Sequence, residues 1–376
     1  MAAMFSLDRH KNDTSVMLDL LRAVAAQAVC IGHAINFFMW QWRPTHFPLM
    51  QNVGVLLFFI LSGFLIAHTL GQRSDDPSYS FGHFVIDRFA RIYSGLLPAL
   101  AFVLMLDSII GQRDRLLTLF ANVLMNEGYR GIFPNALPRE AFGSAPQLWT
   151  LAVEWHIYLF VGAAFFILKR RGTLWILIPA LLFFGQTPVR YIVGGYQRDG
   201  IGEGLFSLWL GGALLYFAAG RLKLSRWLAL TLTCIGTAAF IQMTTPGAEY
   251  NLFAYPCLLC AFFGLVMLTQ QINMMAPFAG AIRFFADYSF SLYLSHHTVM
   301  YAIATTWPES GAAGLLWSIV LSNCVGVALA YVGEKHHKQI SRFLLTALRT
   351  RAVKALNKPH TLACSQHMVV ETTPDT

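Results

Sequence analysis

The sequence predicts an all-α polytopic integral membrane protein with about ten transmembrane helices. Hydrophobic residues make up 56% of the 376-residue chain, and only 12% of its residues are charged. Soluble proteins typically contain about 25% charged residues, so a soluble fold of this size could not cover its surface with so few. The composition therefore excludes soluble, disordered and disulfide-rich secreted proteins.

Ten apolar runs are candidate spans, since a helix needs about 20 mostly apolar residues to cross the hydrocarbon core. They cover residues 16–38, 51–70, 92–111, 148–168, 173–187, 204–220, 227–243, 251–270, 283–306 and 313–333. The run at 173–187 is short and ends before Pro188, so a tilted or re-entrant piece is the alternative there. The expected domains are a cytoplasmic segment over 1–15, a transmembrane domain over 16–333 and a basic cytoplasmic tail over 334–376, partly disordered.

The distribution of positive charge sets the expected orientation, because Lys and Arg concentrate on the cytoplasmic side of membrane proteins. With both termini in the cytoplasm, most of the 27 Lys and Arg residues lie in cytoplasmic segments. The net charge of +8 then indicates contact with anionic membrane lipid and no nucleic-acid partner. We expect a multi-pass protein of the inner or plasma membrane. For its largest outer segment, 112–147, there are two alternatives: the segment binds an external substrate, or it only connects two helices.

Ionisable residues inside the spans are the candidates for function, because each costs at least about 2.5–3.5 kcal/mol in a bilayer. The first span carries Asp19, Arg22 and His33. The spacing of Arg22 and His33 places both on one helix face, about 16 Å apart along the axis. Asp19 lies one turn before Arg22 and can pair with it. A snorkelling Arg and a structural His are the alternative.

Three further positions complete a two-sided polar site. Glu154 in the fourth span lies at the depth of His33, so the two meet if their helices are neighbours, and a carboxylate raises the basicity of an imidazole. Arg88 and Arg91 share a helix face at the cytoplasmic end of the third span, where Arg grips phosphate bidentately. An ordinary positive flank is the alternative for this R-x-x-R. The layout suits a cytosolic phosphorylated donor and an external acceptor, or a transporter with a proton relay.

Two further groups of residues have side chains that can take part in chemistry. His296 lies near the middle of the ninth span, and the adjacent His297 points about 100° away, so only one of them is expected to face the protein interior. Cys257 and Cys260 form a C-x-x-C. A zinc site needs four ligands, and no second pair or nearby His completes one, so no metal site is expected.

With these residues identified, the chain resembles the membrane acyltransferase-3 family, which O-acylates sugars of bacterial surface polysaccharides and other acceptors. Five segments between residues 18 and 297 match the family's motifs in order: LDLLRAVAAQAVCIGH, GVLLFFILSGFLI, RFARIY, LWTLAVEW and YSFSLYLSHH. The resemblance implies a catalytic role for His33 and Glu154 and binding of the acyl-CoA donor by Arg22, Arg88 and Arg91. Asp19, Tyr293 and His296 are expected to support the site.

The resemblance also implies the reaction. An acyl group, with acetyl as the first candidate, would move from cytoplasmic acyl-CoA to a hydroxyl of a carbohydrate, a cell-surface glycan or a lipid-linked sugar, with no bound cofactor. The motifs depart from the family's pattern at Leu56, where Asp is frequent, at Ser94, where Pro is usual, and at His297 and Thr298, where x-Pro often follows the late His. The residues after the last span are too few for a further domain, so a stand-alone form is expected.

Two other functional classes stay open at this point. A secondary transporter could use His33, Glu154 and His296 as a proton relay, although no paired repeat with broken helices is visible in the sequence. A non-catalytic membrane subunit of a polysaccharide-export complex is the second alternative. It predicts that His33 can be replaced without effect.

Overall fold

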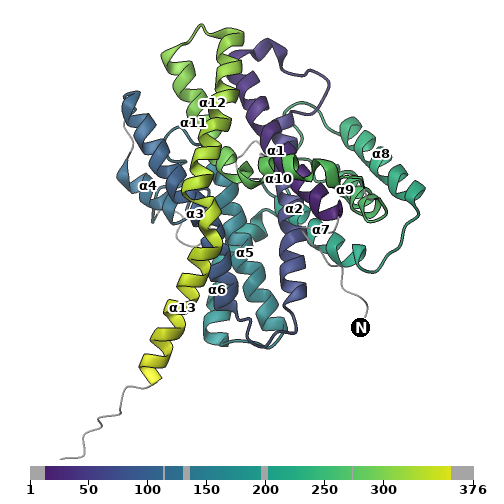
Figure 1. The fold of residues 1–376 in the computed structure, drawn as a ribbon, viewed down its shortest axis with the longest axis vertical. Helices are drawn as coiled ribbons and strands as arrows, with labels where there is room; N and C mark the ends of the chain where they lie inside the picture. The colour runs from purple at the N-terminus through teal and green to yellow at the C-terminus, as the bar shows by residue number, and fades with distance from the viewer. Residues whose placement is uncertain (1–12, 113–114, 130–135, 196–201, 273, 357–376) are drawn as a thin grey trace, which may run out of the picture.

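The computed structural model describes residues 13–112, 115–129, 136–195, 202–272 and 274–356, and every regular element within them is a helix (Figure 1). The long apolar helices are α1 (Asp13–Phe38), α2 (Met50–Gln72), α3 (Phe81–Ile109), α5 (Leu148–Leu168), α8 (Arg226–Met243) and α12 (Gly311–Val332). The shorter ones are α4 (Leu116–Val123), α6 (Leu174–Arg190), α7 (Leu205–Ala219), α9 (Tyr255–Thr269), α10 (Ala279–Asp287) and α11 (Ser289–Thr306), and α13 (His337–Leu356) follows α12.

The chain is a helical membrane protein. Six helical stretches within the described residues are long and apolar enough to cross a bilayer, namely α1, α2, α3, α5, α8 and the stretch Gly311–Leu348, and α6, α7 and α9 are shorter apolar helices. The all-helical fold is confirmed for the described residues, whereas the count of about ten spans and the cytoplasmic termini stay predictions. Most of the predicted segment 1–15 and the end of the predicted tail lie outside the described residues, and residues 337–356 of that tail form α13.

The third helix begins eleven residues earlier than the predicted span at 92–111. Ser80 caps it, and its Oγ accepts a hydrogen bond from the backbone N–H of His83, as an N-cap serine does. The first turns contain His83, Asp87, Arg88 and Arg91, so an apolar window could not detect them. Arg88 and Arg91 therefore lie within the helix, about two to three turns from its start.

The predicted span at 283–306 is wrong as a single helix, because the chain leaves helical dihedral angles at Tyr288 (φ −112°, ψ 4°). Tyr288 donates a hydrogen bond from its hydroxyl to Oδ1 of Asn323 in α12, at 2.7 Å. The short helix α10 precedes this break, packs against α1 and lies across the bundle, whereas α11 runs alongside α1 and α12 (Figure 1). Because of this break, the first residues of α11 lie in the interior of the protein.

Helix α2 contacts both α1 and α5 through small residues and polar groups. A Cβ at Gly54 would lie 2.6 Å from the carbonyl oxygen of Ala25, so α1 and α2 approach closely there. At the next contact, the hydroxyls of Ser62 in α2 and Tyr158 in α5 are 2.9 Å apart. This packing order decides which polar side chains of α1 and α5 can meet.

A substitution at Gly63 tests the close packing of α2. A Cβ at this position would lie 2.0 Å from the carbonyl oxygen of Trp209 in α7, a backbone atom that cannot turn aside. We expect Gly63→Ala to destabilise the protein by about 1–3 kcal/mol through overpacking, measured as a lower midpoint of thermal unfolding in detergent. Gly280→Ala is the matched control, because nothing lies within 4 Å of a Cβ there. Equal midpoints for the two variants would contradict the contact.

Candidate active site

Two adjoining hollows lie among the helices. The wider one, here called the vestibule, is bordered by α1, α2, α3, α10, α12 and α13. The second, here called the inner cavity, lies between α2, α3, α5 and α11. Arg22, Arg88, Arg91 and Leu65 line both hollows, so the three predicted arginines form the neck that joins them.

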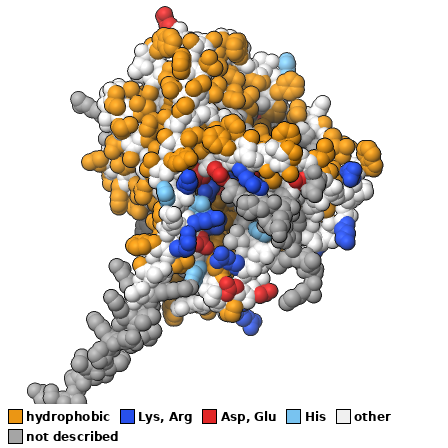
Figure 2. Space-filling model, viewed as in Figure 1, with side chains coloured by type: hydrophobic (Ala, Val, Ile, Leu, Met, Phe, Trp, Pro, Cys, Tyr) orange, Lys and Arg blue, Asp and Glu red, His pale blue; other side chains and the backbone are white. Residues whose placement is uncertain are grey.

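The vestibule is strongly charged. Figure 2 shows Lys and Arg side chains, with a few carboxylates and histidines, gathered in a hollow below a broad apolar surface. The residues that line it include seven cations and four carboxylates: Arg22, Arg73, Arg88, Arg91, Lys335, Lys338 and Arg342, with Asp19, Asp87, Asp287 and Glu334. A hollow of this kind favours an anionic ligand with several charges.

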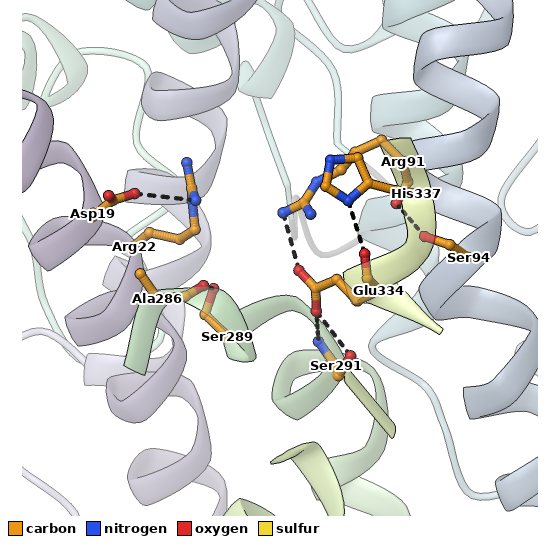
Figure 3. A network of polar contacts seen from close by, with 9 residues as sticks. All are labelled: Asp19, Arg22, Arg91, Ser94, Ala286, Ser289, Ser291, Glu334 and His337. Carbon is orange, nitrogen blue, oxygen red and sulfur yellow. Dashed lines mark hydrogen bonds and ion pairs between the residues drawn. The ribbon is translucent and has the colours of Figure 1, made fainter. Parts of the chain in front are cut away.

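Two of the neck arginines are fixed by carboxylates. Nη1 of Arg22 lies 3.4 Å from Oδ1 of Asp19, which is the pairing that their spacing predicts. Nη2 of Arg91 lies 3.0 Å from Oε1 of Glu334, a residue that is only 1% exposed. Ser291 donates to the other oxygen of Glu334 through its backbone N–H (3.2 Å) and its Oγ (2.9 Å), as Figure 3 shows. The guanidinium groups are thus held at the neck.

The third neck arginine, Arg88, is differently placed. Its Nε is buried and has no hydrogen-bond partner within the part of the chain that the structure describes. A buried donor without a partner is costly. A phosphate oxygen bound at the neck would supply that partner, and Arg is suited to hold phosphate in this way.

Glu154 lies in the inner cavity and is held there by a short polar chain. The hydroxyl of Tyr158 donates to Oε1 of Glu154. The same hydroxyl lies 2.9 Å from Oγ of Ser62, which accepts a hydrogen bond of 3.0 Å from the indole N–H of Trp209. Apart from these groups, the deeper wall of the cavity is mainly apolar, with Val55, Phe58, Phe59, Leu61, Ile66 and Leu151. Glu154 is the carboxylate nearest to any ligand that enters this cavity.

His33 lies in a separate group of three imidazole rings. Its ring centroid is 5.3 Å from that of His296 and 5.5 Å from that of His297. His296 is fully buried, and its Nδ1 lies 2.8 Å from the carbonyl oxygen of Tyr293. Because a carbonyl only accepts hydrogen bonds, Nδ1 carries the proton in the neutral ring, and Nε2 keeps its lone pair. Both adjacent histidines face His33, although the helical spacing predicts only one.

The end of the segment 112–147 fixes His297. The carbonyl oxygen of Ser144 accepts a hydrogen bond of 2.7 Å from Nδ1 of His297, and its Oγ donates to Oγ1 of Thr298 at 2.9 Å. The backbone N–H of Ser144 in turn donates to Oδ2 of the fully buried Asp107 in α3, at 2.9 Å. The end of this segment is therefore tied into the helical core, and Asp107 acts on His297 through one residue.

His33 and Glu154 do not form a pair. Helix α1 packs against α2, α10, α11 and α12, whereas α5 packs against α3 and α6. Tyr293 lies between the two groups: it lines the inner cavity, and its ring centroid is 5.9 Å from that of His296. Its hydroxyl is anchored to Oγ1 of Thr150 at 2.5 Å. The neck arginines, Glu154 and Tyr293 thus line the inner cavity, and Tyr293 also contacts the cluster of histidines.

Sequence reasoning did not select Asp107, Ser144 or His297 for the site. The sequence does point to Asp107, because a carboxylate inside an apolar run costs free energy in a bilayer. His297 lies next to His296, which the sequence analysis includes in the site. Ser144 acts through its backbone carbonyl and N–H, so a pattern of side chains in the sequence could not predict its role. Glu334 was placed in the tail, whereas it pairs with Arg91 at the neck.

The fold and site define a helical membrane protein with a basic vestibule that adjoins a buried cavity. A family model described as an acyltransferase domain matches residues 16–334. The chain belongs to this family, the membrane acyltransferase-3 family.

Three curated relatives are similar to this chain. The peptidoglycan O-acetyltransferase OatA of Listeria monocytogenes is 28% identical over 327 residues, which is 75% of this chain and 49% of that protein. YrhL of Bacillus subtilis, to which the same activity is provisionally assigned, is 28% identical over 365 residues, covering 84% and 53%. Protein 2 in the picA locus of Rhizobium radiobacter is 36% identical over 88 residues, covering 23% and 43%. The chain spans about half the length of these relatives. No solved structure matches it significantly.

Proposed function

We propose that this protein is a membrane O-acyltransferase that moves an acyl group, with acetyl as the first candidate, from acyl-CoA to a hydroxyl of a cell-surface glycan. The observation that carries the proposal is the arrangement of the site, in which the vestibule and the inner cavity share the three arginines of the neck. A basic vestibule narrows at three arginines into a mainly apolar cavity with one carboxylate, and a cluster of three histidines lies behind it. The peptidoglycan O-acetyltransferase named among the relatives supports a glycan acceptor.

The donor would enter from the vestibule, which we place on the cytoplasmic side. Arg22, Arg88 and Arg91 would hold its phosphates at the neck, and the apolar wall of the inner cavity would receive the pantetheine arm with its thioester. Glu154 would give the pantetheine arm a polar contact and so assist in orienting its thioester end past Tyr293 toward His33. Lipid surrounds the apolar helices, and the reaction needs no bound cofactor in this scheme.

The acceptor would approach His33 from the other side of the membrane. His33 would accept the proton of the acceptor hydroxyl while the hydroxyl oxygen attacks the thioester carbon. The carbon–sulfur bond then breaks, an ester forms, and the proton passes to the departing thiolate, which leaves as CoA. A brief acyl-imidazole on His33 is the other route to the same products. A thioester is already activated, so positioning and one base suffice.

The function is tested by mass spectrometry of surface glycans from a deletion strain, with and without the restored gene. We expect a fixed mass increment, such as that of an acetyl group, only in the restored strain. Unchanged glycan masses in both strains, together with no turnover of radiolabelled acyl-CoA in membranes, would contradict acyl transfer. Uptake of a substrate without covalent change would instead support the transporter alternative.

Asp107 provides a second prediction, as a positioning residue that acts through Ser144 on His297. Asp107→Ala removes the acceptor for the Ser144 N–H, so the His297 ring loses its fixed place against His33. We expect kcat to fall about 10- to 100-fold, with the KM for acyl-CoA unchanged because the neck is untouched. Asp107→Asn is the matched control, since its amide oxygen still accepts this bond. Equal losses in the two variants, or a shift confined to KM, would contradict the positioning role.

A further inference from the structure

Helix α13 is fixed to the helix that carries two of the neck arginines. Oγ of Ser341 donates to Oδ1 of Asp87 in α3, at 2.5 Å. One turn of helix further along α3, Arg91 pairs with Glu334, which lies just before the start of α13. Figure 1 shows α13 continuing past the end of the bundle. Its first two turns are therefore held beside the vestibule, and the rest extends away from it.

One face of these two turns lines the vestibule. Lys338, Ser341, Arg342 and Leu345 all border it, and their spacing of three and four residues places them on the same side of a helix. Lys338 and Arg342 are exposed, whereas Ser341 is buried against α3. The anchor and the two cations thus share a face, so the anchor directs both cations into the opening.

The cations of α13 are not neutralised by neighbouring carboxylates. Three of the four carboxylates in the vestibule lie beside other cations: Asp19 pairs with Arg22, Glu334 pairs with Arg91, and Asp87 lies 4.0 Å from Arg73. Within the described chain, no ion pair joins Lys338 or Arg342 to a carboxylate. Lys335, which also borders the vestibule, stacks its ammonium over the ring of Tyr331 at 4.2 Å. Positive charge therefore remains available well outside the neck.

We propose that Lys338 and Arg342 of α13 bind the 3′-phosphate at the nucleotide end of acyl-CoA. The inference rests on the proposed function and extends the donor site to a second set of phosphate ligands. Acyl-CoA is a linear molecule with its thioester at one end, a diphosphate in the middle and a phosphorylated nucleotide at the other end. With the pantetheine arm in the inner cavity beside Glu154 and the diphosphate at the neck, the nucleotide lies in the vestibule, where α13 supplies the remaining cations.

The test compares two donors in protein reconstituted into nanodiscs of zwitterionic lipid. For Lys338→Ala/Arg342→Ala, we expect the KM for acetyl-CoA to rise about tenfold, with kcat within twofold of wild type, because charge-assisted contacts to the phosphate are lost. With acetyl-3′-dephospho-CoA, the variant and the wild type should have the same KM. Lys223→Ala/Arg226→Ala is the matched control: it removes the same charge at exposed positions that do not border the vestibule.

Several outcomes would overturn the inference. An equal rise in KM with both donors would show that the two cations do not bind the 3′-phosphate. An equal rise in KM for Lys223→Ala/Arg226→Ala would show that the effect comes from net charge. A difference that appears only when anionic lipid is added to the nanodiscs assigns the cations to lipid headgroups.

Binding of adenosine 3′,5′-bisphosphate, measured by calorimetry, separates this inference from the proposed function. If the wild type binds it and the double variant binds about tenfold more weakly, the site on α13 stands even if no acyl transfer is found. If the wild type transfers the acyl group and both proteins bind the bisphosphate equally, the proposed function stands and the α13 site is refuted.

Discussion

His33→Ala is expected to abolish acyl transfer and to leave the protein folded and inserted in the membrane. A general base contributes typically about 10²- to 10⁴-fold to a rate. His296 and His297 are each held by Nδ1 at a backbone carbonyl, so their rings keep their positions when His33 is removed. His33 is only half-buried and makes ring contacts but no hydrogen bond within the described residues. Its removal therefore leaves no buried polar group without a partner.

The measurement is the release of free CoA thiol from acyl-CoA in membranes that hold equal amounts of each protein. His46→Ala is the matched control, because this histidine is exposed in the segment between α1 and α2. The control should release thiol at the wild-type rate, and His33→Ala should match membranes without the protein. Retention of more than a tenth of the wild-type rate by His33→Ala would remove this residue from the mechanism.

Glu154→Gln is expected to have the second largest effect, a loss of about 100-fold in kcat. The substitution keeps the size of the side chain and an oxygen that accepts the hydrogen bond from Tyr158, so it isolates the carboxylate's ability to carry charge or a proton. The inner cavity has no other carboxylate in its lining, so nothing nearby compensates. The KM for acyl-CoA should change little, because the phosphates bind at the neck and beyond.

Initial rates over a range of acyl-CoA concentrations separate these two parameters. Glu309→Gln provides the control, since that carboxylate is exposed between α11 and α12 and away from both hollows. A variant with wild-type kcat and wild-type KM would show that the charge of Glu154 has no part in the reaction. A rise in KM alone would place it among the groups that bind the donor.

Some helices and the local pairing at one neck arginine could be predicted from the sequence. The apolar run at 148–168 coincides with α5, and the pairing of Asp19 with Arg22 follows from their spacing on one helix. Such features are local, since they depend only on hydropathy and on the period of the α-helix. The start of α3 could not be found in this way, because its first turns carry charged residues.

The meeting of His33 with His296 and His297 could not be predicted in the same way. Depth in the membrane follows from position in a span, but lateral neighbours depend on packing between helices. Close packing at Gly54 and Gly63 sets α2 against α1 and α7, and the break at Tyr288 sets the path of α11. These contacts place Glu154 in the inner cavity and His33 among the histidines, with Tyr293 between them.

The central claim is that donor and acceptor use opposite ends of one continuous site. Sealed proteoliposomes with the protein in a single orientation test it most directly, with radiolabelled acetyl-CoA outside, on the vestibule side, and a glycan oligomer inside. We predict that labelled acetyl esters accumulate on the enclosed oligomer with wild-type protein and do not form with His33→Ala. Esters that form only when donor and oligomer are on the same side of the membrane would contradict the claim.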